Sequence, residues 1–362
     1  MDKNLSDRLF KAYRAGLLRP PQAKESRARQ FDFLFRQVFW LKIPVHERLP
    51  VWKSWRLSSQ GLRESREGRL DAALATFRDC RTELETRELS PAGRLLAATF
   101  LESAHAYFEY KRGEFDLARA RILNAMEADL ELERDPDFSL LELHRIQLAQ
   151  NLMRIDLRAG EPKRALVLAG QLLAYTAGLV GELPVHHSWQ GERLLARAPR
   201  SPRRALIAQI ANDVAQAFPY FPAAHLEEEF LANARIEDYL DRPHVVHEQF
   251  RLWLLAKQAF HQEDRDRYLQ LLLEFLPTGR TGIQAMWYAA VIDLLALCRE
   301  LDGGAARDLE RGILRDAGKW SHLPAAFRPL VGLAPRDDRR PPAEPQAVRF
   351  AAPQSLNGHA PA

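Results

Sequence analysis

A helix–turn–helix motif occurs three times in the first half of the chain, and this motif constrains the fold more than any other feature. Residues 104–128 form one complete unit, in which a turn at Gly113 is followed by apolar residues at positions i, i+4, i+7 and i+8: Ala118, Ile122, Ala125 and Met126. Residues 66–80 and 159–173 repeat the turn glycine with an alanine five positions later, which gives the pairs Gly68/Ala73, Gly113/Ala118 and Gly160/Ala165. A helical period interrupted by turn glycines predicts antiparallel helix pairs and an all-α fold.

The composition agrees with this prediction. Leu, Ala, Arg and Glu dominate the 362 residues, β-branched runs are few, and 46% hydrophobic residues are enough for a core. The two cysteines, Cys80 and Cys298, lie far apart on apolar helical faces. We therefore expect two buried, reduced thiols and no disulfide framework.

No segment indicates secretion or a membrane span. Charges are scattered through the first 18 residues, and no apolar stretch with a cleavage site follows them. The longest charge-free run, Ala165–Gly181, contains Gln171 and two internal glycines, and it falls where the repeat requires a buried helix. We expect a cytoplasmic protein without a membrane span.

Basic residues are concentrated near the N-terminus. Residues 1–70 contain sixteen Lys and Arg against seven Asp and Glu, although the net charge of the whole chain is only +4. Such a surplus favours an acidic partner, including nucleic acid, but it is also typical of solvated helix faces.

Residues 1–50 are predicted to form an N-terminal helical cap. Two helices are expected at 5–18 and 24–42, separated by Pro20 and Pro21, which stop the first helix. The second helix contains Phe31, Phe33, Phe35, Phe39 and Trp40. A membrane-surface helix is one interpretation, but interruption of its apolar face by Asp32 and Arg36 favours a helix packed against the first repeat.

From residue 51 the pattern resembles the tetratricopeptide repeat, most clearly over 54–175. The first unit carries the small, turn and large residues of that family at Gly61, Gly68, Leu70, Ala73 and Phe77. The second matches at Ala106, Gly113, Phe115, Ala118, Ile122 and Ala125, whereas the third is weaker, with Pro162 at a large apolar position. The turn glycines are 45 and 47 residues apart, against about 34 in the family, so longer helices or loops must absorb the difference. The resemblance implies a superhelical array of helix hairpins, or α-solenoid, in 51–175.

The remaining chain divides into three predicted parts. Residues 176–202 are predicted to form an irregular basic insertion. An arginine cluster begins in this insertion and continues just past its end: Arg193, Arg197, Arg200, Arg203 and Arg204. Residues 203–333 are expected to form divergent helical hairpins, recognisable only by their period. Residues 334–362 contain six prolines and almost no large apolar side chains, and are predicted to be a disordered tail.

In tetratricopeptide proteins the first helices of successive hairpins line a concave groove that holds a peptide. The corresponding positions here are Trp55, Ser58, Leu62, Ser65 and Arg66, then Phe100, Ser103, Tyr107, Tyr110 and Lys111, then Gln147, Gln150, Arg154, Leu157 and Arg158. Cations, amides and tyrosines without a carboxylate suit an acidic or C-terminal peptide, although ordinary solvated surface residues are the simpler interpretation. The predicted partner-binding residues are Arg66, Tyr107, Tyr110, Lys111, Gln150, Arg154 and Arg158.

Three motifs contain histidines at spacings that could bind a metal. Glu102 and His105 have the i, i+3 spacing of di-iron helical bundles, but a second copy is missing from the sequence. His244, His247 and Glu248, and the pair His186 and His187, have no matching ligand set. The resemblance implies no catalytic residues, and we expect no metal and no cofactor.

The favoured function is a non-catalytic cytoplasmic adaptor or assembly factor that binds a partner protein or peptide in its groove. The alternatives are a nucleic-acid-associated regulatory module that uses the basic N-terminal region, and an all-α enzyme with a site in 176–261.

Overall fold

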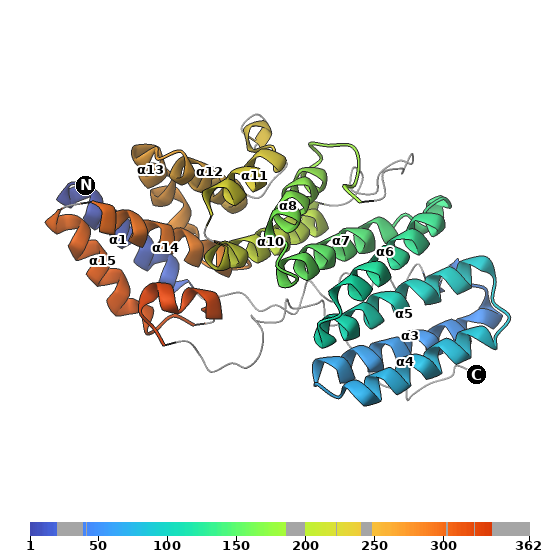
Figure 1. Ribbon diagram of the computed structural model, residues 1–362. Coiled ribbons are helices and arrows are strands. Elements are labelled where there is room, and N and C mark those ends of the chain that lie inside the picture. The colour runs from blue at the N-terminus through green and yellow to red at the C-terminus, as the bar shows by residue number, and fades with distance from the viewer. Residues whose placement is uncertain are drawn as a thin grey trace, which may run out of the picture.

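The computed structural model describes residues 1–19, 39–40, 42–185, 200–221, 223–239, 248–301, 303–321 and 323–334. Throughout these ranges the regular secondary structure is helical, and they contain no strand (Figure 1). Most of the predicted helix at 24–42 and of the basic insertion lies outside the described residues, as do the predicted tail from 335 onward and His186, His187, His244 and His247.

Three helix pairs form the first half of the structure. They are α3 (Val45–Arg66) with α4 (Leu70–Glu85), α5 (Pro91–Arg112) with α6 (Phe115–Leu132), and α7 (Leu141–Arg158) with α8 (Pro162–Ala177). The predicted turn glycines Gly68, Gly113 and Gly160 adopt φ values of +77°, +81° and +81°, which side chains with a Cβ rarely adopt. Both α3 and α5 contain 22 residues, so longer helices absorb part of the long repeat spacing.

Close approach within the first pair depends on a small residue. A Cβ added at Gly61 would lie 2.6 Å from the ring of Phe77, so only glycine lets α3 and α4 meet with this ring between them. Gly61, the small residue of the sequence pattern, thus lies where α3 and α4 approach each other closely.

The three pairs do not all stack in the same way. α5 packs against α3, whereas α7 packs most extensively on α6 (Figure 1). α7 reaches α5 through the rings of His144 and Phe100. The first helices of the second and third pairs are thus less closely packed than those of the first and second.

The second half of the structure is also helical. Its helices are α10 (Arg200–Ala217), α11 (Ala224–Asn233), α12 (Glu248–His261), α13 (Arg265–Phe275), α14 (Gln284–Glu300) and α15 (Gly304–Ala317), with short 3₁₀ turns between several of them. α11 ends at Asn233, and two 3₁₀ turns, Ala325–Phe327 and Pro329–Val331, follow α15. α8 packs against both α10 and α11, so the third pair is continuous with this half.

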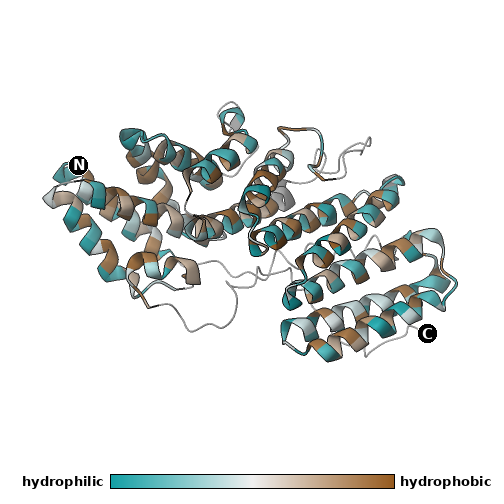
Figure 2. Ribbon diagram, viewed as in Figure 1, coloured by the Kyte–Doolittle hydropathy of each residue, from teal (hydrophilic) through white to brown (hydrophobic). Residues whose placement is uncertain are grey.

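Apolar side chains follow this packing. One large buried cluster extends from the second helix pair through α15, while two smaller clusters hold the first two pairs together. Polar and apolar residues alternate along the helices (Figure 2), and the part of α8 that lies within the charge-free run, residues 165–177, is mostly buried. In the part of the chain that the structure describes, no helix has the length and apolarity needed to span a membrane.

The N-terminal helix α1 (Lys3–Leu18) packs at the opposite end of the molecule from the first helix pair. It contacts α13, α15 and the 3₁₀ turn Leu276–Thr278 (Figure 1), and its Tyr13 ring stacks on Trp287 with a centroid distance of 5.6 Å. The hydroxyl of Tyr13 accepts a hydrogen bond of 2.8 Å from Trp320 Nε1. Residues 3–18 therefore do not cap the first repeat, as a single 1–50 cap would require, because their apolar face fits the C-terminal helices.

Candidate functional site

Four of the predicted partner-binding residues form a cluster on α3 and α5, which we call the tyrosine patch: Arg66, Tyr107, Tyr110 and Lys111. The guanidinium carbon of Arg66 lies 5.6 Å from the ring centroid of Tyr107, and Lys111 Nζ lies 5.7 Å from the same centroid. The rings of Tyr107 and Tyr110 are 5.9 Å apart. All four residues are partly exposed.

Helix packing explains how these residues meet. α3 packs side by side with α5, so Arg66 in the last turn of α3 lies beside the last turns of α5. Cations in a last turn interact favourably with the partial negative charge of the helix C-terminus. A cation placed over an aromatic ring gains about 0.5–1 kcal/mol at an exposed site. The patch thus combines positive charge with aromatic surface.

Gln150 and Arg154 are bonded inside the molecule instead of lining an open groove. Gln150 is fully buried and donates a 2.5 Å hydrogen bond to Asp213 Oδ2 of α10. Arg154 forms an ion pair of 2.8 Å with the same carboxylate. Burial raises the pKa of Asp213, while Arg154 and Gln150 act to lower it. A partner could reach Gln150 only after α10 had moved.

The last predicted residue, Arg158, is exposed at the end of α7. It lies close enough to Tyr220 for its charge to oppose the rise in the pKa of Tyr220 that burial causes. The seven predicted residues are therefore divided between the tyrosine patch, the α7–α10 contact and the edge of α7.

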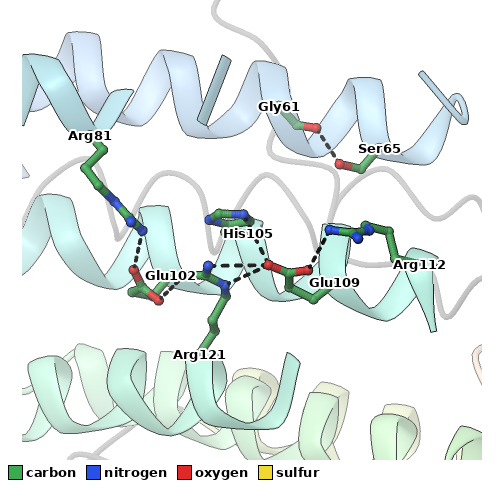
Figure 3. A network of polar contacts seen from close by, with 8 residues as sticks. All are labelled: Gly61, Ser65, Arg81, Glu102, His105, Glu109, Arg112 and Arg121. Atoms are coloured by element: carbon green, nitrogen blue, oxygen red, sulfur yellow. Dashed lines mark hydrogen bonds and ion pairs between the residues drawn. The ribbon is translucent and has the colours of Figure 1, made fainter. Parts of the chain in front are cut away.

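The motif Glu102-x-x-His105 belongs to a network of ion pairs between α4, α5 and α6 (Figure 3). Arg121 donates to Glu102 Oε2 at 3.0 Å and to Glu109 Oε1 at 3.4 Å, and Arg81 pairs with Glu102 from α4. Glu102 and Glu109 are thus paired with arginines in this structure.

His105 is the unusual member of this network. Its ring stacks on Phe77 at 4.6 Å, and neither ring nitrogen has a hydrogen-bond partner. Burial, together with the nearby charges of Arg121 and Arg81, lowers the pKa of His105 to about 3. The side chain is therefore neutral at physiological pH.

Two buried ionic groups could not be identified from the sequence. Arg145 forms a bidentate pair with Glu133, at 2.6 and 2.8 Å, and both side chains are fully buried. Lys257 pairs with Glu227 at 3.0 Å and with Asp293 at 3.1 Å. The only sequence signal was a charged residue on an otherwise apolar helical face.

The two cysteines are buried, and the predicted basic cluster lies mostly outside the described residues. Cys80 and Cys298 are buried free thiols, as expected, and burial raises the pKa of Cys298 to about 12, so this thiol is unreactive. Within the described residues, no three His, Cys, Asp or Glu side chains converge as a metal site. In the arginine cluster 193–204, only the side chain of Arg204 is described.

No protein-family model matches the chain, and no curated protein and no solved structure matches it either.

Proposed function

We propose that the chain is a non-catalytic cytoplasmic adaptor or assembly factor, in which tetratricopeptide-like helix pairs form a superhelical array and the tyrosine patch binds an acidic segment of a partner protein. The observation that supports this proposal best is the contact of Arg66, from one helix pair, and Lys111, from the next, with the ring of Tyr107. Two cations beside one ring combine positive charge with aromatic surface, which suits a partner segment that carries carboxylates.

The contact between α7 and α10 limits where a partner can bind. Gln150 and Arg154 of α7 are bonded to Asp213 of α10, so the proposed contact surface is confined to the first two helix pairs. This surface is smaller than a groove that runs through all three pairs. An extended segment with one or two carboxylates and an apolar residue for Tyr107 or Tyr110 fits it best.

Affinity capture from the native cell extract tests the proposal, with the full chain compared with the double variant Arg66→Glu, Lys111→Glu. Each reversed charge is expected to weaken binding of a carboxylate by about tenfold to a hundredfold, because a charge-assisted hydrogen bond is replaced by repulsion. The matched control is Arg78→Glu, Lys319→Glu, which makes the same change in net charge at exposed residues outside the patch.

A partner retained by the full chain and the control but lost by the double variant supports the patch. Tyr107→Ala should also lose the partner, whereas Tyr107→Phe, which keeps the ring, should retain it. A partner held equally by the double variant contradicts the proposal. Capture of nucleic acid, with a steep loss of binding as salt is raised, would instead support the regulatory alternative.

A further inference from the structure

A second surface feature lies between the first and last helices of the described chain. α1 and α15 border an open surface hollow of about 470 Å³, lined by Phe10, Arg14, Asp308, Arg311, Gly312 and Arg315. Three guanidinium groups face one carboxylate, so the lining is positive. None of these residues belongs to the tyrosine patch.

A glycine contributes to the shape of the hollow. A Cβ added at Gly312 would lie 2.8 Å from the ring of Phe10, so the ring rests against α15 only because the side chain is absent. A glycine inside a helix costs about 1 kcal/mol relative to alanine, and close packing of an aromatic ring is a physical reason for it here. Phe10 is thereby held as an aromatic wall, with the Arg14 guanidinium carbon 4.7 Å from its centroid.

The three arginines differ in their ion pairs. Arg14 is fixed by Asp316 at 3.2 Å, and Arg311 pairs with Asp308 one turn earlier on α15. Within the described residues, Arg315 forms no ion pair with a carboxylate, and its side chain is exposed beside the other two. The hollow therefore contains a guanidinium group whose charge is not balanced locally, next to two whose orientation is restrained.

We propose that this hollow is a binding site for a phosphate group, either as the free ion or on a small organic molecule. Guanidinium groups bind phosphate through paired, charge-assisted hydrogen bonds, and Arg315 and Arg311 supply such donors one helical turn apart. The volume lies within the range of small-molecule sites, roughly 300–1,000 Å³. Asp308 at the rim disfavours a long polyanion, because a chain of phosphates would pass close to its carboxylate.

Isothermal titration calorimetry on the full chain tests this site, with inorganic phosphate and glycerol 3-phosphate as separate probes at constant ionic strength. One saturable site per chain is expected. Arg315→Ala should weaken it by about tenfold or more, because a charged donor is removed, and Arg315→Lys should weaken it less, because only the paired geometry is lost. Arg78→Ala, an exposed cation on α4, is the control and should bind as the unaltered chain does.

The two probes distinguish the source of the phosphate. Binding of glycerol 3-phosphate but not of inorganic phosphate assigns the hollow to an organic phosphate, and the reverse assigns it to the free ion. Absence of saturable binding with both probes overturns the proposal, and so does equal affinity in Arg315→Ala. Because Arg315 is exposed, this variant should unfold at the same temperature as the unaltered chain, which separates loss of the site from loss of the fold.

Discussion

Acid sensitivity caused by His105 gives the sharpest test of the structure. This side chain is buried beside Arg121 and Arg81, and its ring nitrogens have no hydrogen-bond partner, although Nε2 lies 3.5 Å from Glu109 Oε1. Its pKa is lowered from 6.5 to about 3, so burial and the two arginines outweigh this carboxylate. The folded state therefore disfavours protonation, whereas the unfolded chain takes up a proton below about pH 6.5. His105 should destabilise the fold increasingly as the pH falls from 6.5 towards 3.

The magnitude follows from the two pKa values. At pH 5 the unfolded state gains about 2 kcal/mol from protonation of His105, while the folded state gains almost nothing, and at pH 7 the difference is close to zero. Since 92% of the side chain is shielded from water, little screening reduces this value.

Urea unfolding at pH 7 and pH 5, followed by circular dichroism, measures the effect in the unaltered chain and in His105→Leu. Leucine has a similar volume, cannot ionise, and breaks no hydrogen bond at this position. The loss of unfolding free energy between the two pH values should be about 2 kcal/mol smaller in the variant.

Other groups titrate in the same range, so the comparison between the two proteins is essential. Burial raises the pKa of Glu133 to about 7, which acts in the opposite direction, because a carboxyl that prefers the neutral form stabilises the fold as the pH falls. Glu133 is present in both proteins and cancels in the difference. If both proteins lose the same free energy between pH 7 and pH 5, the explanation based on His105 is refuted.

Three further substitutions test the fold by thermal or urea unfolding. Gly113→Ala should cost about 1 kcal/mol from the positive φ alone, because a Cβ there would meet no other atom, and a loss above about 3 kcal/mol would contradict this account. Gly16→Ala should release α1 from the C-terminal helices, since its Cβ would lie 2.0 Å from the backbone oxygen of Leu276; protease cleavage within α1 should increase, and unchanged protection would show that α1 is packed differently. Arg145→Met should destabilise the fold by about 3–5 kcal/mol at pH 8, because Glu133 loses its partner and must either stay charged in the core or take up a proton far above its unfolded pKa, and the cost should fall at pH 5.5, where protonation is easier; equal costs at both pH values would argue against the raised pKa.

Local features of the fold could be predicted from the sequence. The turn glycines, the small residue at Gly61 and the approximate bounds of most described helices follow from the 3.6-residue period and from the conformations open to glycine. The sequence also placed Arg66, Tyr107 and Lys111 on corresponding faces of two helices, and in the structure these residues lie close together, whereas their binding of a partner stays a prediction.

Contacts between segments far apart in the chain could not be predicted in this way. The period shows that one face of a helix is apolar, but it does not say which helix will cover that face. Thus Gln150 and Arg154 were assigned to an open groove, although Asp213 of α10 binds both. For the same reason, the predicted N-terminal cap over 1–50 groups α1 with the helix expected at 24–42, whereas Tyr13 of α1 packs with Trp287 and Trp320 at the other end.

The sequence by itself therefore determined the all-helical class, the paired helices and the turns, because these depend on residues a few positions apart. Only the tertiary structure decided which charged side chains became buried partners and which stayed at the surface. It also brought α1 and α15 together around the arginine-lined hollow. These features depend on packing between residues as many as 300 positions apart, for which helical periodicity carries no signal.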